Sequence, residues 1–184
     1  MKKVIAAAAV LLSAAALVFA LNFETVDDHY GAKGERSSNR SVTLYVNCIE
    51  LLDIDETSMS SALRSSGVIP SDGIIIPEGE YPLHEGDTAF DVLRSALNDK
   101  RIHFDYTSIS DKSAYVKGIN NIYEYDCGDL SGWMYSVNGI FPTISSSEYV
   151  LEDGDRIVWM YTCDLGRDVG DTYYTMNGGS DHEN

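Results

Sequence analysis

The spacing of apolar and polar positions along the chain predicts mostly short β-strands. A strand with one buried face is expected wherever β-branched or aromatic residues recur at every second position. Such strands are predicted at residues 42–48, 73–77, 80–83, 102–107, 114–117, 122–125, 132–137, 148–151 and 156–162. In the last of these, apolar residues occupy both faces, which is typical of an interior strand.

One segment instead has helical spacing. Asp87 or Thr88 can cap a helix that runs on towards residue 100. Its apolar residues recur on a single face: Phe90, Leu93, Ala96 and Leu97. A second, shorter helix is predicted at residues 58–65. Together these elements predict an α+β fold in which a mixed sheet of five to seven strands packs on one main helix.

The two ends of the chain differ in composition from its centre. Residues 1–20 place two lysines before an Ala-rich apolar stretch that ends in Val18-Phe19-Ala20. This pattern is typical of a signal peptide, with an uncleaved membrane anchor as the alternative. The composition of the chain after residue 20 predicts a polar linker at 21–40, one domain at 41–170 and a flexible tail at 171–184. The domain is therefore expected outside the cytoplasm, either extracellular or at the cell surface.

The chain is strongly acidic. Its 184 residues contain 13 Lys+Arg against 29 Asp+Glu, which gives a net charge of −16. A charge of this sign excludes nucleic-acid binding, which needs a basic surface, and disfavours anionic lipid headgroups. Contact with a membrane is expected only through residues 1–20, if they are retained.

The polar residues do not form a recognisable catalytic or metal motif. A Ser or Cys nucleophile needs a neighbouring base, and neither His84 nor His103 lies in such a setting. The acidic groups that come nearest to a calcium loop are 85–87, 153–155, Asp164, Asp168 and Asp171. None completes the loop pattern, so we interpret them as turn residues, with a cation site as the alternative. We predict a non-enzymatic protein with no metal or other cofactor.

An aromatic segment surrounds Asn138-Gly139. This dipeptide predicts a type I′ hairpin turn, because both positions must adopt positive φ. Trp133, Tyr135 and Phe141 flank the turn. Large, rigid rings beside a turn can form a platform for a flat, partly apolar ligand. Burial of the same rings in the core is the alternative.

Four segments occur in the order found in the bacterial transcobalamin C-terminal-like family, a family of domains of unknown function. They are EGDTAFDVL (85–93), GINNIYEYDCG (118–128), LSGWMYSVNGIFP (130–142) and LEDGDRIVWMYTCDLGRDVG (151–170). Residues 42–170 resemble this family and are more distantly similar to the β-domain of animal intrinsic factor and transcobalamin. The resemblance implies a β-grasp fold in which the first and last strands are neighbours.

The resemblance also implies a ligand site. In the animal proteins the β-domain closes over cobalamin held against a helical barrel, which 184 residues cannot also hold. Carried over by position, the contacting residues are Trp133, Met134, Tyr135, Ser136, Val137, Asn138, Gly139, Ile140, Phe141 and Pro142, and, in a neighbouring strand, Ser113, Ala114, Tyr115 and Val116.

The three cysteines form no CxxC pair, which excludes a zinc ribbon, and their odd number allows at most one internal disulfide. Family members often have a further cysteine shortly after the Phe-Pro pair, and this chain lacks it. The resemblance therefore implies that Cys127 has lost its partner and that Cys48 pairs with Cys163, because these two residues end the neighbouring first and last strands.

The expected function is that of an extracytoplasmic binding module for cobalamin or another corrinoid-type ligand. A β-domain alone covers one side of such a ligand, so we expect modest affinity unless a partner supplies the other side. The predicted partner is an envelope transporter or a binding protein. The alternative is a cell-surface module that contacts another protein or a glycan and has no small-molecule ligand.

Overall fold

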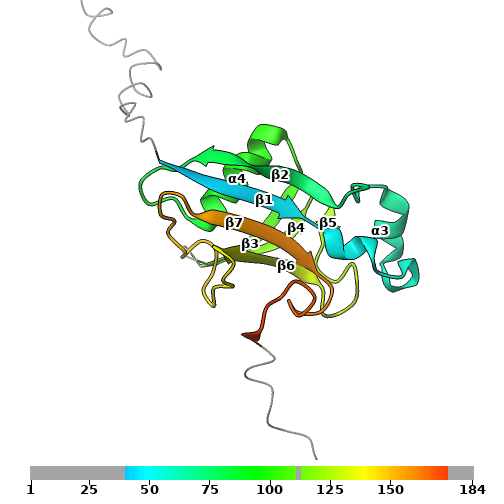
Figure 1. Cartoon of the computed structure of the whole chain (residues 1–184). Coiled ribbons are helices and arrows are strands. Elements are labelled where there is room, and N and C mark those ends of the chain that lie inside the picture. The colour runs from blue at the N-terminus through cyan, green and yellow to red at the C-terminus, as the bar shows by residue number, and fades with distance from the viewer. Residues whose placement is uncertain (1–39, 111–112, 174–184) are drawn as a thin grey trace, which may run out of the picture. The chain divides into compact units, whose positions relative to one another are not determined.

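The computed structural model describes residues 40–110 and 113–173. Along the chain the elements are β1 (Ser41–Asn47), the short 3-10 helices η1 (Ile49–Leu52) and η2 (Glu56–Ser58), α3 (Ser61–Ser66), β2 (Ile74–Pro82), α4 (Ala89–Lys100), β3 (Phe104–Ser110), β4 (Ser113–Ile119), β5 (Ile122–Tyr123), β6 (Gly132–Val137) and β7 (Arg156–Thr162) (Figure 1). The predicted α+β class is confirmed. The signal segment, nearly all of the linker and most of the tail lie outside the described residues.

Four strands form a mixed sheet in the order β2-β1-β7-β6. At its centre β1 and β7 run parallel, with Leu44 opposite Ile157, and the outer strands β2 and β6 are antiparallel to their neighbours. The first and last strands are therefore neighbours, and β7 has the interior position that its sequence predicted. Figure 1 shows β1 and β7 side by side along the sheet.

The other three strands form a separate antiparallel sheet in the order β3-β4-β5. The prediction of one sheet with five to seven strands is wrong in this respect. Within the described residues, β3 and β4 pair with each other, and β5 pairs with β4, so none of the three extends the four-stranded sheet. Strand pairing is a property of the whole fold, and the pattern within one strand does not contain it.

Helix α4 begins with a reciprocal capping box. The Thr88 hydroxyl accepts a hydrogen bond from the Asp91 backbone N–H at 3.2 Å, and the Asp91 carboxylate accepts one from the Thr88 N–H at 3.2 Å. Thr88 is thus the cap, while the Asp87 carboxylate accepts a hydrogen bond from the His84 N–H instead. The helix buries six residues: Ala89, Phe90, Val92, Leu93, Ala96 and Leu97.

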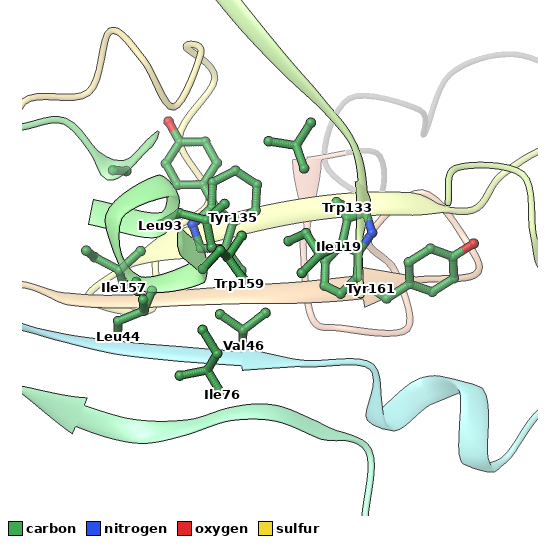
Figure 2. Close-up of a cluster of buried hydrophobic side chains, with 14 of the residues drawn as sticks. Leu44, Val46, Ile76, Leu93, Ile119, Trp133, Tyr135, Ile157, Trp159 and Tyr161 are labelled. Carbon is green, nitrogen blue, oxygen red and sulfur yellow. The ribbon is translucent and has the colours of Figure 1, made fainter. Parts of the chain in front are cut away.

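The core lies on one face of the four-stranded sheet. Val46 is opposite Ile76 on one side and Trp159 on the other, and Trp159 is opposite Tyr135. Directly opposed residues project from the same face, so these side chains form one apolar row across all four strands. Figure 2 shows this row together with Leu93 of α4. All five side chains are buried.

Two predicted strand boundaries need correction. The expected strands at 73–77 and 80–83 are one strand, β2, which continues through Pro77 because an edge strand does not need that residue's N–H. Residues 148–151 form no named strand: Val150 makes a single bridge with Thr88. In the described part of the chain, no helix is both long and apolar enough to cross a membrane.

Candidate functional site

The turn at Asn138-Gly139 has the predicted geometry. Both residues have positive φ, 54° for Asn138 and 79° for Gly139, as a type I′ turn requires. Val137 and Ile140 close it by two backbone hydrogen bonds, at 2.9 Å and 3.0 Å. Beyond Ile140 the chain leaves the sheet, and the long partner of β6 is β7. The turn is therefore a projecting tip of β6 and does not join two paired strands.

The side chain of Asn138 fixes this tip to the start of β7. Its amide group donates to Asp155 Oδ1 at 2.7 Å, and its Oδ1 accepts from the Arg156 N–H at 2.9 Å. The Asn138 backbone N–H also donates to the Arg156 carbonyl at 2.8 Å. Three hydrogen bonds to one short segment hold the turn in place, so the residues that follow it are presented from a preorganised support.

An apolar side chain projects beyond the turn and borders a hollow. Ile140 is 70% exposed, the largest exposed fraction among the large hydrophobic residues of the described chain. The hollow has a volume of about 360 Å³ and is lined by Gly139, Ile140, Phe141, Gly170, Asp171, Thr172 and Tyr173. We call it the turn hollow. Residues 171–173, which the sequence predicted as part of a flexible tail, contribute to this surface.

Trp133 and Tyr135 lie in the core, not on a platform. Their exposed fractions are 8% and 9%. Trp133 Nε1 donates to the Ile122 carbonyl at 2.9 Å, and the Tyr135 hydroxyl donates to the Ile144 carbonyl at 2.9 Å. Burial raises the pKa of Tyr135 above its ordinary value. The predicted exposed aromatic platform is thus wrong for both rings, since residues two apart in a strand share a face and this face is covered.

The remaining residues of the predicted segment divide by exposure. Ser136 and Val137 are buried. Those that are exposed or half-buried are Met134, Asn138, Gly139, Ile140, Phe141 and Pro142. Of these, Gly139, Ile140 and Phe141 line the turn hollow. The part of the predicted segment that remains available to a ligand is therefore the tip of β6 and the residues directly after it.

The second predicted segment lies in β4 and borders a different hollow. Ser113 and Ala114 line a space of about 230 Å³, Tyr115 is exposed, and Val116 is buried. The other residues lining this space, which the sequence analysis did not propose, are Thr88, Phe90, Asp91, Arg94, Tyr106, Ser108 and Ser147. The two hollows share no lining residue. The structure therefore does not bring the two predicted segments together in one pocket.

A loop nevertheless connects the two segments. Tyr135 of β6 donates to the Ile144 carbonyl, and the hydroxyl of the next residue, Ser145, donates to the Ala114 carbonyl of β4 at 3.1 Å. The Ala114 N–H in turn donates to the Ser147 hydroxyl at 2.9 Å. The serines at 145 and 147 thus fasten the loop to β4.

Neither histidine of the described chain forms a nucleophilic dyad. His84 Nδ1 lies 3.0 Å from Asp87 Oδ2, and His103 Nε2 lies 2.7 Å from the Tyr123 hydroxyl. Neither contact brings a Ser or Cys side chain to an imidazole, which nucleophilic catalysis of this kind requires.

The acidic residues near the end of β7 act as local structural groups. Asp164 pairs with Arg167, and hydrogen bonding by this guanidinium lowers the pKa of Asp164. Asp168 accepts from the Thr162 hydroxyl and from the Cys163 N–H. Asp171 accepts from a backbone N–H further along. Among the described residues no cluster of three or more His, Cys, Asp or Glu side chains is placed to hold a metal ion.

The implied disulfide between Cys48 and Cys163 is not present, and all three cysteines are free. In the parallel pair β1–β7, Asn47 is opposite Met160. The next residue, Cys48, therefore falls opposite Tyr161, two residues before Cys163. Two residues of strand correspond to roughly 6–7 Å, which is too far along the strand for an S–S bond. Burial raises the pKa of Cys48 to about 12. The predicted pairing is therefore wrong, although the two strands are neighbours as expected.

Residues 86–163 match the model of a family described as a domain of unknown function (DUF4430). The DUF4430 match runs from just before α4 to the residue after β7, so it contains the tip of β6, while β1 and β2 precede it. The predicted resemblance to a transcobalamin C-terminal-like domain of unknown function is thereby confirmed. No curated protein matches the chain in sequence.

Several solved structures are similar to this chain, among them the following two. Haptocorrin in complex with Cbi is 16% identical, with a TM-score of 0.48, over 68% of this chain and 25% of the haptocorrin chain. A protein from Ruminococcus gnavus, described as a candidate metal-binding protein, is 13% identical, with a TM-score of 0.38, over 67% of this chain and 96% of that one. The chain thus spans about a quarter of the haptocorrin chain.

Proposed function

We propose that this protein is a non-enzymatic binding module that contacts one edge of a corrinoid-type small molecule through the turn hollow. The observation that carries the proposal is the exposure of Ile140 beside a hollow of about 360 Å³, on a turn fixed by Asn138. An apolar side chain that is largely exposed gains free energy when a ligand covers it. The resemblance to transcobalamin C-terminal-like domains selects corrinoids as the ligand class.

The chemistry of the hollow suits a ligand that is partly apolar and partly polar. Ile140, Phe141 and the Tyr173 ring supply apolar surface, and the Asp171 carboxylate adds an acceptor. Small-molecule sites commonly combine a mostly apolar lining with a few polar groups that orient the ligand. Because the turn is already ordered, little conformational entropy is lost in this part of the protein on binding.

The size of the hollow limits how much of a ligand it covers. Its volume of about 360 Å³ is near the lower end of the roughly 300–1,000 Å³ that is usual for small-molecule pockets. A corrin ring is larger than such a space, so only one edge of it can enter. We therefore expect weak binding by this protein alone and stronger binding when a partner, such as an envelope transporter or a binding protein, covers the other side.

We further propose a β-grasp architecture and an extracytoplasmic setting. The β-grasp assignment is supported by the parallel central pair β1–β7, the antiparallel outer strands β2 and β6, and the one long helix α4. The setting is supported by the apolar, Ala-rich composition of residues 1–20. In this scheme residues 21–40 link that segment to a domain at 41–170.

Titration of the full-length chain into hydroxocobalamin tests the proposal. We expect a saturable change in the visible absorption spectrum at micromolar to millimolar protein. Ile140→Ser should weaken binding by about 10-fold or more, because an apolar side chain loses its buried contact. Val150→Ser is the matched control, since Val150 is also an exposed aliphatic residue and does not line the turn hollow. It should change the affinity less than two-fold.

Two outcomes would contradict this proposal. One is the absence of any spectral change up to millimolar protein, alone or with an added envelope extract. The other is an equal loss of affinity in the Ile140 and Val150 variants, which would place the ligand elsewhere. If an Ile140-dependent partner is captured from the envelope without any corrinoid, the alternative function, a surface module for a protein or glycan, is favoured.

A further inference from the structure

Cys127 and Cys163 come from segments that the fold holds side by side. Cys127 lies in the connection between β5 and β6, and its N–H donates to the Ser131 hydroxyl oxygen at 3.0 Å. The Tyr161 hydroxyl donates to the same oxygen at 3.0 Å. The next residue, Gly132, is paired with Thr162, which directly precedes Cys163. The β5–β6 connection and the end of β7 are therefore fixed to each other close to the two cysteines.

The thiols of these two cysteines are close neighbours. Burial, together with the neighbouring thiol of Cys127, raises the pKa of Cys163. Cys127 is buried, whereas Cys163 is half-buried and so more accessible to solvent. Cys48 is excluded from this pair by the register of β1 and β7.

We infer that Cys127 and Cys163 form a redox-active pair that a small disulfide such as oxidised glutathione converts to an intramolecular disulfide. The inference depends on the geometry of these two segments and is independent of the ligand proposed above. The bond would join the β5–β6 connection to the end of the central strand β7. It would thus tie the small sheet, through β5, to the large one.

The reaction is an ordinary thiol–disulfide exchange. The thiolate of Cys163, the more accessible residue, attacks one sulfur of oxidised glutathione, forming a mixed disulfide and releasing one glutathione thiolate. The Cys127 thiolate then attacks the Cys163 sulfur and releases the second. The two thiol protons end on the two released glutathiones, and the two electrons lost by the cysteine pair reduce the glutathione disulfide. Because both steps need a thiolate, the reaction should become faster as the pH rises from 7 to 9.

Mass spectrometry of the full-length chain tests the inference. The protein is incubated with oxidised glutathione at pH 8.5, the remaining thiols are blocked with N-ethylmaleimide, and the digest is analysed without reduction. We expect one crosslinked pair of peptides, containing Cys127 and Cys163, with the blocking group on Cys48. The oxidised protein should have a Tm higher than the reduced protein by roughly 10 °C, because the link restricts the unfolded chain.

Two variants make the result specific. Cys48→Ser should keep both the crosslink and the rise in Tm, and Cys127→Ser should lose both. A crosslink between Cys48 and Cys163 would overturn the inference. So would glutathione adducts on both Cys127 and Cys163 without a crosslink, in native protein and after refolding with the same oxidant. If Cys127→Ser does not fold, the peptide map of the wild type and of Cys48→Ser still decides the question.

Discussion

The ring of Tyr135 stacks on the ring of Trp159 with 5.3 Å between centroids and 26° between planes. This contact joins the outer strand β6 to the central strand β7 on the face that carries the core. Two residues along each strand, Trp133 meets Tyr161 edge to face, with 5.4 Å between ring centroids. The aromatic residues of β6 thus stabilise the sheet, and the residues available to a ligand begin at the turn that follows.

The first prediction separates the core role of Trp133 from the surface role of Ile140. Trp133→Ala removes a buried ring and its hydrogen bond to Ile122, so we expect a loss of about 3–5 kcal/mol in the free energy of unfolding. Ile140→Ala should change it by less than about 0.5 kcal/mol, because the side chain is already exposed. Urea unfolding of both variants measures the difference. Equal effects would mean that Trp133 is not part of the core.

The second prediction concerns the start of α4. Thr88→Ala removes the side chain that caps the first turn, and also leaves the Asp91 carboxylate without its hydroxyl partner. We expect a loss of about 1–2 kcal/mol in the free energy of unfolding. Ser95→Ala, on the exposed side of the same helix, should be neutral or slightly stabilising. Thermal or urea unfolding distinguishes the two, and a neutral Thr88→Ala would show that the capping box adds nothing.

The third prediction isolates a backbone effect at the turn. A Cβ added at Gly139 would meet no atom within 4 Å, but the residue has a φ of 79°. Gly139→Ala should therefore cost about 1 kcal/mol through backbone conformation alone. Gly79→Ala is a suitable control, because it also has room for a Cβ and does not have positive φ. A larger loss in the control than in Gly139→Ala would contradict this explanation.

The fourth prediction is a loss of stability at alkaline pH. Burial raises the pKa of Tyr161 in the folded protein, while an unfolded tyrosine ionises near pH ~10. Above that pH the unfolded chain binds fewer protons than the folded one, so the free energy of unfolding falls as pH rises. This group contributes a slope of about 1.4 kcal/mol per pH unit until its folded pKa is reached.

Buried Cys48 also makes the free energy of unfolding fall as pH rises, and its effect begins at a lower pH than that of Tyr161. Its pKa is about 12 in the folded protein and about 8.5 in an unfolded chain, so its contribution is lost from about pH 8.5 upwards. Urea unfolding between pH 7 and 11 measures the combined decline. Tyr161→Phe should reduce the slope only above about pH 10, and Cys48→Ala should reduce it from about pH 8.5. Stability that stays constant to pH 11 would contradict the burial of both groups.

The sequence alone determined those features that depend only on residues close together in the chain, such as strand bounds, the helix cap and the turn. The strands at 132–137 and 156–162 have the predicted bounds, because runs of β-branched and aromatic residues between turn residues define them without reference to other segments. The sequence predicted Asp87 or Thr88 as the helix cap, and Thr88 is the cap, with its partner Asp91 three residues away. Positive φ at Asn138 and Gly139 likewise follows from those two residues.

Tertiary structure decided what covers each surface and which segments pair. Alternation shows that Trp133 and Tyr135 share a face, but only the assembled fold shows that this face meets the core. The division of the described strands into two sheets and the proximity of Cys163 to Cys127 depend in the same way on residues distant in sequence. The burial of a strand face depends on what packs against it, and the pairing of a strand depends on its partner. The sequence of one strand describes only one side of each of these contacts.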